Sequence, residues 1–180
     1  MNTLKRRGMR RVVISLGFAG LFVAFNAIPG AATPSVGFSS QILGRGTEMS
    51  HASLPLKHGL DIVVAQITLL PGGSSGWHSH PGGAIAIIQQ GEITFYSSGV
   101  GKGDQQGQSQ SNVEGGGRHP HCVITRYTAG QSFVELPGEV GFAKNTGSIN
   151  TIIVATFPDV PVGVVGAQRI DQPNPRTCGI

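Results

Sequence analysis

The sequence predicts an all-β protein that folds as a single-domain barrel, and three observations support this. The chain has 180 residues, a length that suits one domain with a buried core. It contains 28 glycines and 11 prolines, and only 12% of its residues are charged, a composition that favours many short strands joined by turns. After residue 33, no segment has the apolar periodicity of a helix.

The expected strands are short apolar runs bounded by glycine and proline. The first covers residues 61–70 and ends at Pro71-Gly72-Gly73. A polar, glycine-rich stretch over residues 39–50 precedes it and has no strand pattern. The remaining strands are expected at 84–89, 92–96, 123–127, 132–136, 142–144 and 151–157. Regular short strands of this kind are typical of a β-sandwich or a β-barrel.

Four parts are expected along the chain. They are a signal peptide (1–32), an N-terminal lead-in (33–58), the barrel (59–160) and a C-terminal tail (161–180). Within the barrel, residues 97–117 are rich in serine, glycine and glutamine and have no apolar periodicity. We expect this segment to be a long mobile loop.

The N-terminus predicts export. Five of the 13 Lys and Arg residues lie in the first 11 positions, residues 12–28 are almost wholly apolar, and Gly30-Ala31-Ala32 is a run of small residues. We therefore expect cleavage near Ala32 and a secreted or periplasmic protein with no stable membrane span. The alternative is a retained membrane anchor. It is disfavoured because the apolar stretch is at the short edge of a bilayer-spanning length and contains Asn26.

The rest of the chain is nearly neutral. From position 33 onward it carries eight basic and nine acidic residues. A nucleic-acid-binding domain concentrates basic residues on its folded surface, and no such patch is evident. We therefore expect no nucleic-acid partner.

Two histidines separated by one residue carry the chemical signal. On an extended segment, His78 and His80 face the same side, which is the barrel interior. Two neutral imidazoles can share one metal ion. The alternative is a pair of hydrogen-bonded, cavity-lining histidines without metal. The same alternation turns Trp77 away from them, towards core or interface packing.

These residues resemble the cupin superfamily. Gly72, His78, His80 and Gly91 match its first motif, and residues 130–145, with Pro137 and Asn145 as fixed points, match its second. The resemblance covers residues 61–157 and is closest to small exported cupins. It implies a jelly-roll barrel, often dimeric, with a metal ion near its open end.

The sequence departs from the cupin motifs at two ligand positions. Ala84 stands where the first motif has glutamate, and Gly141 stands where the second has histidine. Only two of the four ligands that the family supplies are therefore present, whereas catalytic sites keep about three protein ligands. Glu135, on the strand that leads to the second motif, is both a residue that could reach inward to complete the site and the nearest candidate for a general base. Alternation leaves its facing open.

Four further histidines are weighed as surface residues or as extra ligands. His119 and His121 form a second pair beside the expected loop, and they either supply a third imidazole or belong to a polar surface segment. His51 and His58 precede the barrel core and are expected at the surface.

Cys122 and Cys178 are the only cysteines. In an oxidising compartment they would form a disulfide that ties the tail to the barrel. The alternative is two free thiols.

Two functions remain open at this stage. One is a metal-dependent oxygenase, isomerase or lyase that uses Fe, Mn, Ni, Cu or Zn on His78 and His80. The other is a non-catalytic module that binds a small molecule such as a sugar or an organic acid beside a degenerate metal site. A structural homodimer is a third alternative that no residue tests.

Overall fold

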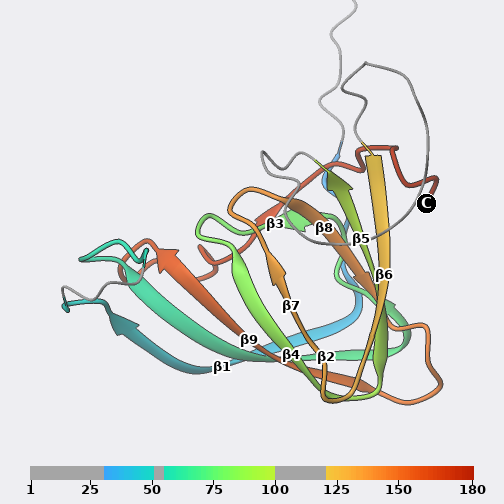
Figure 1. The fold of residues 1–180 in the computed structure, drawn as a ribbon, viewed down its shortest axis with the longest axis horizontal. Coiled ribbons are helices and arrows are strands. Elements are labelled where there is room, and N and C mark those ends of the chain that lie inside the picture. Colours follow the sequence, from blue (N-terminus) through green and yellow to red (C-terminus); the bar gives the residue numbers. More distant parts are fainter. Residues whose placement is uncertain (1–30, 51–54, 100–120) are drawn as a thin grey trace, which may run out of the picture.

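A computed structural model describes residues 31–50, 55–99 and 121–180, and every regular element in this part of the chain is a β-strand. Ten strands, all paired antiparallel, form one sheet that curls into a nearly closed barrel (Figure 1). The predicted all-β barrel is confirmed. The expected signal peptide, apart from residues 31–32, and most of the expected mobile loop at 97–117 lie outside the described residues.

The barrel has two walls. The strands are β1 (Val36–Thr47), β2 (Asp61–Ser74), β3 (His78–Ser79), β4 (Ala84–Gln90), β5 (Glu92–Gly99), β6 (His121–Thr128), β7 (Ser132–Glu135), β8 (Val140–Lys144), β9 (Thr151–Val160) and β10 (Ile170–Asp171). One wall runs β1–β2–β9–β4–β7 and the other β10–β3–β8–β5–β6. The walls meet where Ser74 of β2 pairs with Lys144 of β8.

Strand β1 corrects the interpretation of residues 39–50 as a lead-in without strand structure. It pairs with β2 from Phe38 opposite Leu69 to Thr47 opposite Asp61. Most of its side chains are exposed, so the strand has no alternation of apolar and polar residues for a pattern search to find. The short strand β10, inside the expected C-terminal tail, is missed for the same reason.

Strand β2 also continues beyond its expected end at Leu70. The chain bends at Gly72, whose φ is +76°, a conformation that favours glycine. A Cβ on Gly73 would lie within 2.9 Å of three backbone oxygens. The backbone of Asn145 holds this bend, donating to Gly73 O (2.9 Å) and accepting from Gly72 N (3.1 Å). The Pro-Gly-Gly segment is therefore a corner that carries β2 from one wall to the other.

Inward-facing side chains of both walls fill the core. The buried hydrophobic cluster consists of Val63, Ala65, Leu69, Ala84, Ala86, Ile88, Ile93, Phe95, Phe133, Ala143, Ile153, Ala155, Phe157 and Val160. Five of these side chains are alanines, which are too small to reach the barrel axis. Three of them, Ala86, Ala143 and Ala155, border a cavity that stays open inside the barrel.

A disulfide ties the C-terminal segment to the barrel. Cys122 of β6 bonds to Cys178, with their Cα atoms 5.0 Å apart, which confirms the predicted pair. For a sequence separation of 56, the chain-entropy model gives a stabilisation of about 4 kcal/mol. Among the described residues, no helix is long and apolar enough to cross a membrane.

Candidate metal centre

His78 of β3 and His80, which follows this strand, both face the barrel interior, as predicted. Only 5% of His78 and 4% of His80 is exposed, and their ring centroids lie 4.9 Å apart. Strand β3 is held on both sides, because His78 pairs with Gly141 of β8 and with Asp171 of β10. Trp77 points the other way and packs 5.3 Å from Phe142, which confirms its predicted packing role.

Backbone carbonyls fix the orientation of both imidazole rings. His78 Nδ1 lies 2.9 Å from Gly76 O, and His80 Nδ1 lies 2.5 Å from Gln168 O. Because a carbonyl oxygen only accepts, each Nδ1 carries the proton and each neutral ring keeps its lone pair on Nε2. A backbone carbonyl on the far nitrogen is the usual partner of a metal-binding histidine. Both rings therefore offer Nε2 to the interior.

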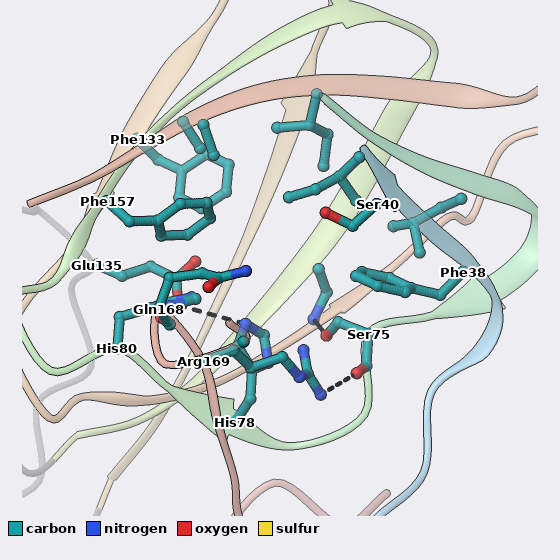
Figure 2. Close-up of a pocket in the computed structure, with 17 residues that line it drawn as sticks. Phe38, Ser40, Ser75, His78, His80, Phe133, Glu135, Phe157, Gln168 and Arg169 are labelled. Atoms are coloured by element: carbon teal, nitrogen blue, oxygen red, sulfur yellow. Dashed lines mark hydrogen bonds and ion pairs between the residues drawn. The ribbon is translucent and has the colours of Figure 1, made fainter. Parts of the chain in front are cut away.

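The third member of the site is Glu135, the last residue of β7. Its side chain is 93% buried, and Oε2 lies 3.9 Å from His78 Nε2 and 3.7 Å from His80 Nε2. Oε2 has no hydrogen-bond partner in the described part of the chain. One ligand atom from each of the three residues lies within 4.8 Å of the other two. Figure 2 shows the three side chains converging at one end of the cavity.

The position of Glu135 explains both departures from the cupin motifs. On the β4–β7 ladder, Glu135 pairs directly with Ala84, so the carboxylate comes from the neighbouring strand. A Cβ on Gly141 would lie 3.0 Å from Glu135 Oε2 and 2.5 Å from the Phe95 ring. The space that a side chain at 141 would need is therefore already filled, in part by the Glu135 carboxylate.

Burial keeps all three groups neutral in the absence of an ion. It raises the pKa of Glu135 to about 8, and the neighbouring charge of Glu139 acts in the same direction. It lowers the pKa of His80 to about 4 and that of His78 well below its usual value. At neutral pH the site therefore holds two neutral imidazoles and a protonated carboxyl group.

This donor set fits a divalent transition-metal ion. Two ligands that each bind one ion at about 2.1 Å lie about 3 to 4 Å apart, which matches the separations of 3.7 and 3.9 Å. Two imidazoles and one carboxylate are typical of non-haem iron and of catalytic zinc sites. An ion would also give the unpartnered Oε2 atom its missing partner.

Beside the three residues lies a cavity of about 210 Å³. The residues that line it are mainly apolar: Phe38, Ser40, Ile67, Leu69, Ser75, His78, His80, Ala86, Phe133, Glu135, Ala143, Ile153, Ala155, Phe157, Gly166, Gln168 and Arg169. Gln168 and Arg169 come from the segment expected only as a tail. Sequence reasoning missed them, because nothing in residues 161–180 signals a return to the barrel interior.

The other candidate histidines do not join the site within the described residues. His58 is exposed, which confirms its predicted surface position. His51 and His119 lie outside the described part of the chain, so a third imidazole from the segment around His119 and His121 stays a prediction.

Comparison with known proteins gives likeness in structure only, since no family model and no curated protein matches the sequence. A Bacillus subtilis oxalate decarboxylase variant aligns with a TM-score of 0.50 and 10% identity, over 79% of this chain but only 30% of that one. An oxalate oxidase in complex with glycolate aligns with a TM-score of 0.48 and 18% identity, over 79% and 62%. A Klebsiella pneumoniae protein with a double-stranded β-helix domain aligns with a TM-score of 0.47 and 15% identity, over 76% and 85%. At these identities the likeness shows the fold alone.

Proposed function

Starting from a cupin barrel whose interior brings three metal-binding side chains together, we propose that this protein binds one divalent transition-metal ion through His78, His80 and Glu135. The observation that carries the proposal is Glu135 Oε2, a buried carboxylate oxygen without a hydrogen-bond partner in the described residues. It faces two Nε2 atoms whose rings are fixed by Gly76 and Gln168. A buried polar atom left open in this way points to a partner from outside the chain.

The proposed activity is metal-dependent chemistry on a small molecule in the adjoining cavity, as an oxygenase, an isomerase or a lyase. When bound, the ion would supply Lewis-acid polarisation or a coordination position for oxygen. The chain's own contribution is to hold three ligands rigidly, to leave coordination positions open towards the cavity, and to exclude water with apolar walls. A dry site of this kind strengthens every electrostatic interaction within it.

A second candidate function is a binding module without catalysis, and one observation favours it. In the described part of the chain, the ionisable residues that line the cavity are the three ligands and Arg169. If Glu135 binds the ion, its carboxylate cannot also act as the general base that the sequence suggested. Turnover of a bound ligand in the presence of metal would support the enzyme, whereas binding without any chemical change would support the module.

Metal binding is tested by elemental analysis and by calorimetric titration of metal-free protein with Fe²⁺, Mn²⁺ and Zn²⁺. We expect about one ion per chain in wild type and loss of binding in the double variant His78→Ala/His80→Ala. In Glu135→Gln we expect affinity to fall by more than tenfold, because the carboxylate is a direct ligand. His58→Ala changes an exposed histidine and serves as the matched control. Equal affinity in wild type and Glu135→Gln would refute the three-residue site.

We also propose that the protein acts in an oxidising compartment outside the cytoplasm. The Cys122–Cys178 disulfide supports this location, together with the leader-like N-terminus. Cell fractionation tests it, with the mass of the mature chain measured under non-reducing conditions. A cytoplasmic product that keeps residues 1–32 would contradict the proposal.

A further inference from the structure

Most of the side chains that line the cavity beside the candidate metal centre are apolar, and Ser40, Ser75 and Gln168 also border it. Three aromatic rings (Phe38, Phe133, Phe157) and two isoleucines (Ile67, Ile153) form most of its walls. Arg169 is the one basic residue that borders it in the described part of the chain. An apolar cavity with a single cation at its edge selects for an occupant with the opposite charge and an apolar body.

The guanidinium group of Arg169 is held in place by the protein. Its Nη2 donates to Ser75 O (2.6 Å), and its Nε donates to Asp171 Oδ1 (2.7 Å). It also lies 5.6 Å from the centre of the Phe38 ring. The next residue, Ile170, pairs with Ser79 of β3, so the arginine is tied to the segment that holds His78 and His80. Figure 2 shows Arg169 between His78 and Phe38.

One donor of Arg169 remains available. Nη1 has no hydrogen-bond partner among the described residues, whereas Nε and Nη2 are both engaged. The side chain is 80% buried, and its neighbour Asp171 is 57% exposed. Arg169 lines the cavity and Asp171 does not, so the positive end of this ion pair is the one that borders the cavity. A fixed guanidinium with a free donor is suited to a carboxylate or another planar oxyanion.

The charge of the loaded site also favours an anion. A divalent ion and the Glu135 carboxylate leave one positive charge, and the positive end of the Arg169–Asp171 ion pair borders the same cavity. Uncompensated charge beside apolar walls is costly, so an anionic occupant lowers the free energy of the loaded site. A neutral sugar would neither balance this charge nor match the aromatic walls.

The size of the cavity limits the apolar body. A cavity of about 150 Å³ holds one benzene molecule, and this cavity measures about 210 Å³. The extra volume suits a benzene ring with one small substituent. Oxalate has no apolar body, so it would leave the rings of Phe133 and Phe157 without a contact.

From these observations we propose that the cavity binds a small apolar monocarboxylate, of the size of benzoate or phenylacetate, with its carboxylate paired to Arg169. The inference rests on the proposed function in one respect, because it names the class of molecule that would be presented to the metal centre. Arg169 is thereby a specificity-determining residue that selects the anion.

The test is calorimetric titration of metal-loaded protein with benzoate and phenylacetate. Benzamide and phenylacetamide are the neutral counterparts of the same shape, and oxalate is the anion without an apolar body. We expect each carboxylate to bind at least tenfold more tightly than its amide and than oxalate. We expect Arg169→Gln to weaken carboxylate binding by about tenfold to a hundredfold, the range for a hydrogen bond to a charged group, while metal affinity changes little. Arg126→Gln removes an exposed arginine of β6 and should change neither affinity.

The outcomes separate this inference from the metal proposal, because metal affinity is measured first in the same protein. If wild type binds metal but binds each amide as tightly as its carboxylate, the anion site is overturned and the metal centre stands. If no metal binds, yet phenylacetate still binds through Arg169, the metal proposal fails and the anion site is supported. The comparison of carboxylate with amide uses wild type alone, so it decides the question even if Arg169→Gln does not fold.

Discussion

Two buried polar side chains of the barrel, Asn145 and Glu135, differ in how completely they are hydrogen-bonded. Asn145 is fully buried and its amide is saturated: Nδ2 donates to Leu69 O and Ile149 O, and Oδ1 accepts from Gly147 N. Glu135 is nearly as buried, yet its Oε2 has no partner in the described residues. Asn145 stabilises the contact between strands and turns, whereas Glu135 keeps one oxygen without a hydrogen bond from the described residues. The barrel therefore separates the polar groups that support the fold from those that form the site.

The largest effect is expected at the saturated side chain. Asn145→Ala removes three hydrogen bonds and takes one donor from the buried carbonyl of Leu69, so we expect the free energy of unfolding to fall by about 3 kcal/mol. Urea denaturation measures this loss. Asn150→Ala, at an exposed position nearby, should stay within about 0.5 kcal/mol of wild type. Equal stability of the two variants would mean that the amide does not stabilise the contact between β2 and the turn that follows β8.

An intermediate effect is expected where the site is crowded. Gly141→Ala places a Cβ 2.5 Å from the Phe95 ring and 3.0 Å from Glu135 Oε2. Overpacking of this kind costs about 1 to 3 kcal/mol, and the carboxylate has to move. We therefore expect lower stability in urea and also weaker metal binding by calorimetry. Gly44→Ala is the control, since no atom lies within 4 Å of its added Cβ. Unchanged metal affinity in Gly141→Ala would show that the space beside Gly141 does not determine the position of the Glu135 carboxylate.

The smallest effect is a pH dependence that belongs to the open carboxyl group. The pKa of Glu135 is raised from 4.5 to about 8, so the folded protein keeps a proton that the unfolded chain loses, and stability falls as pH rises through this range. The pKa of His80 is lowered from 6.5 to about 4. The contribution of His80 to the free energy of unfolding therefore falls only as the pH drops below 6.5. Between pH 7 and 8 the change is therefore due mainly to Glu135.

In metal-free wild type we expect a loss of about 1 kcal/mol between pH 7 and 8, because one pKa unit corresponds to about 1.4 kcal/mol. Glu135→Gln should show no such slope, since glutamine does not titrate. Urea denaturation at the two pH values measures both. A slope that persists in Glu135→Gln would assign the effect to another group and would weaken the contrast with Asn145.

The sequence predicted the barrel well where apolar runs are bounded by turns. The strands near 84–89, 132–136 and 151–157 and the shared facing of His78 and His80 are all present. Strand β1 was missed because its side chains are largely exposed, and an edge strand of this kind needs no apolar alternation. The short strands β3 and β10 depend on pairing with distant segments, which local patterns do not report.

The third ligand shows the limit of sequence reasoning most clearly. Along β7 and the residue that follows it, Phe133 and Glu135 alternate with Val134 and Leu136, so both faces carry apolar residues. Period-two alternation alone therefore gives no reason to choose between them. The choice comes from pairing with β4, which places Glu135 opposite Ala84. The motif predicts a glutamate at position 84 on β4, whereas the glutamate that faces the two histidines lies on β7.

The short strand β10 also sets an order of assembly. The last long strand, β9, ends at Val160, but the ring of His80 is held by Gln168, and the guanidinium that borders the cavity belongs to Arg169. Residues emerge in chain order during synthesis, so the walls of the barrel can pair before these two residues are in place. A chain that stops after residue 160 would keep the three candidate ligands, but it would lose the Gln168 carbonyl that orients the His80 ring. Residues 161–180 therefore complete the surroundings of His80 and of the cavity only after they have docked on the barrel.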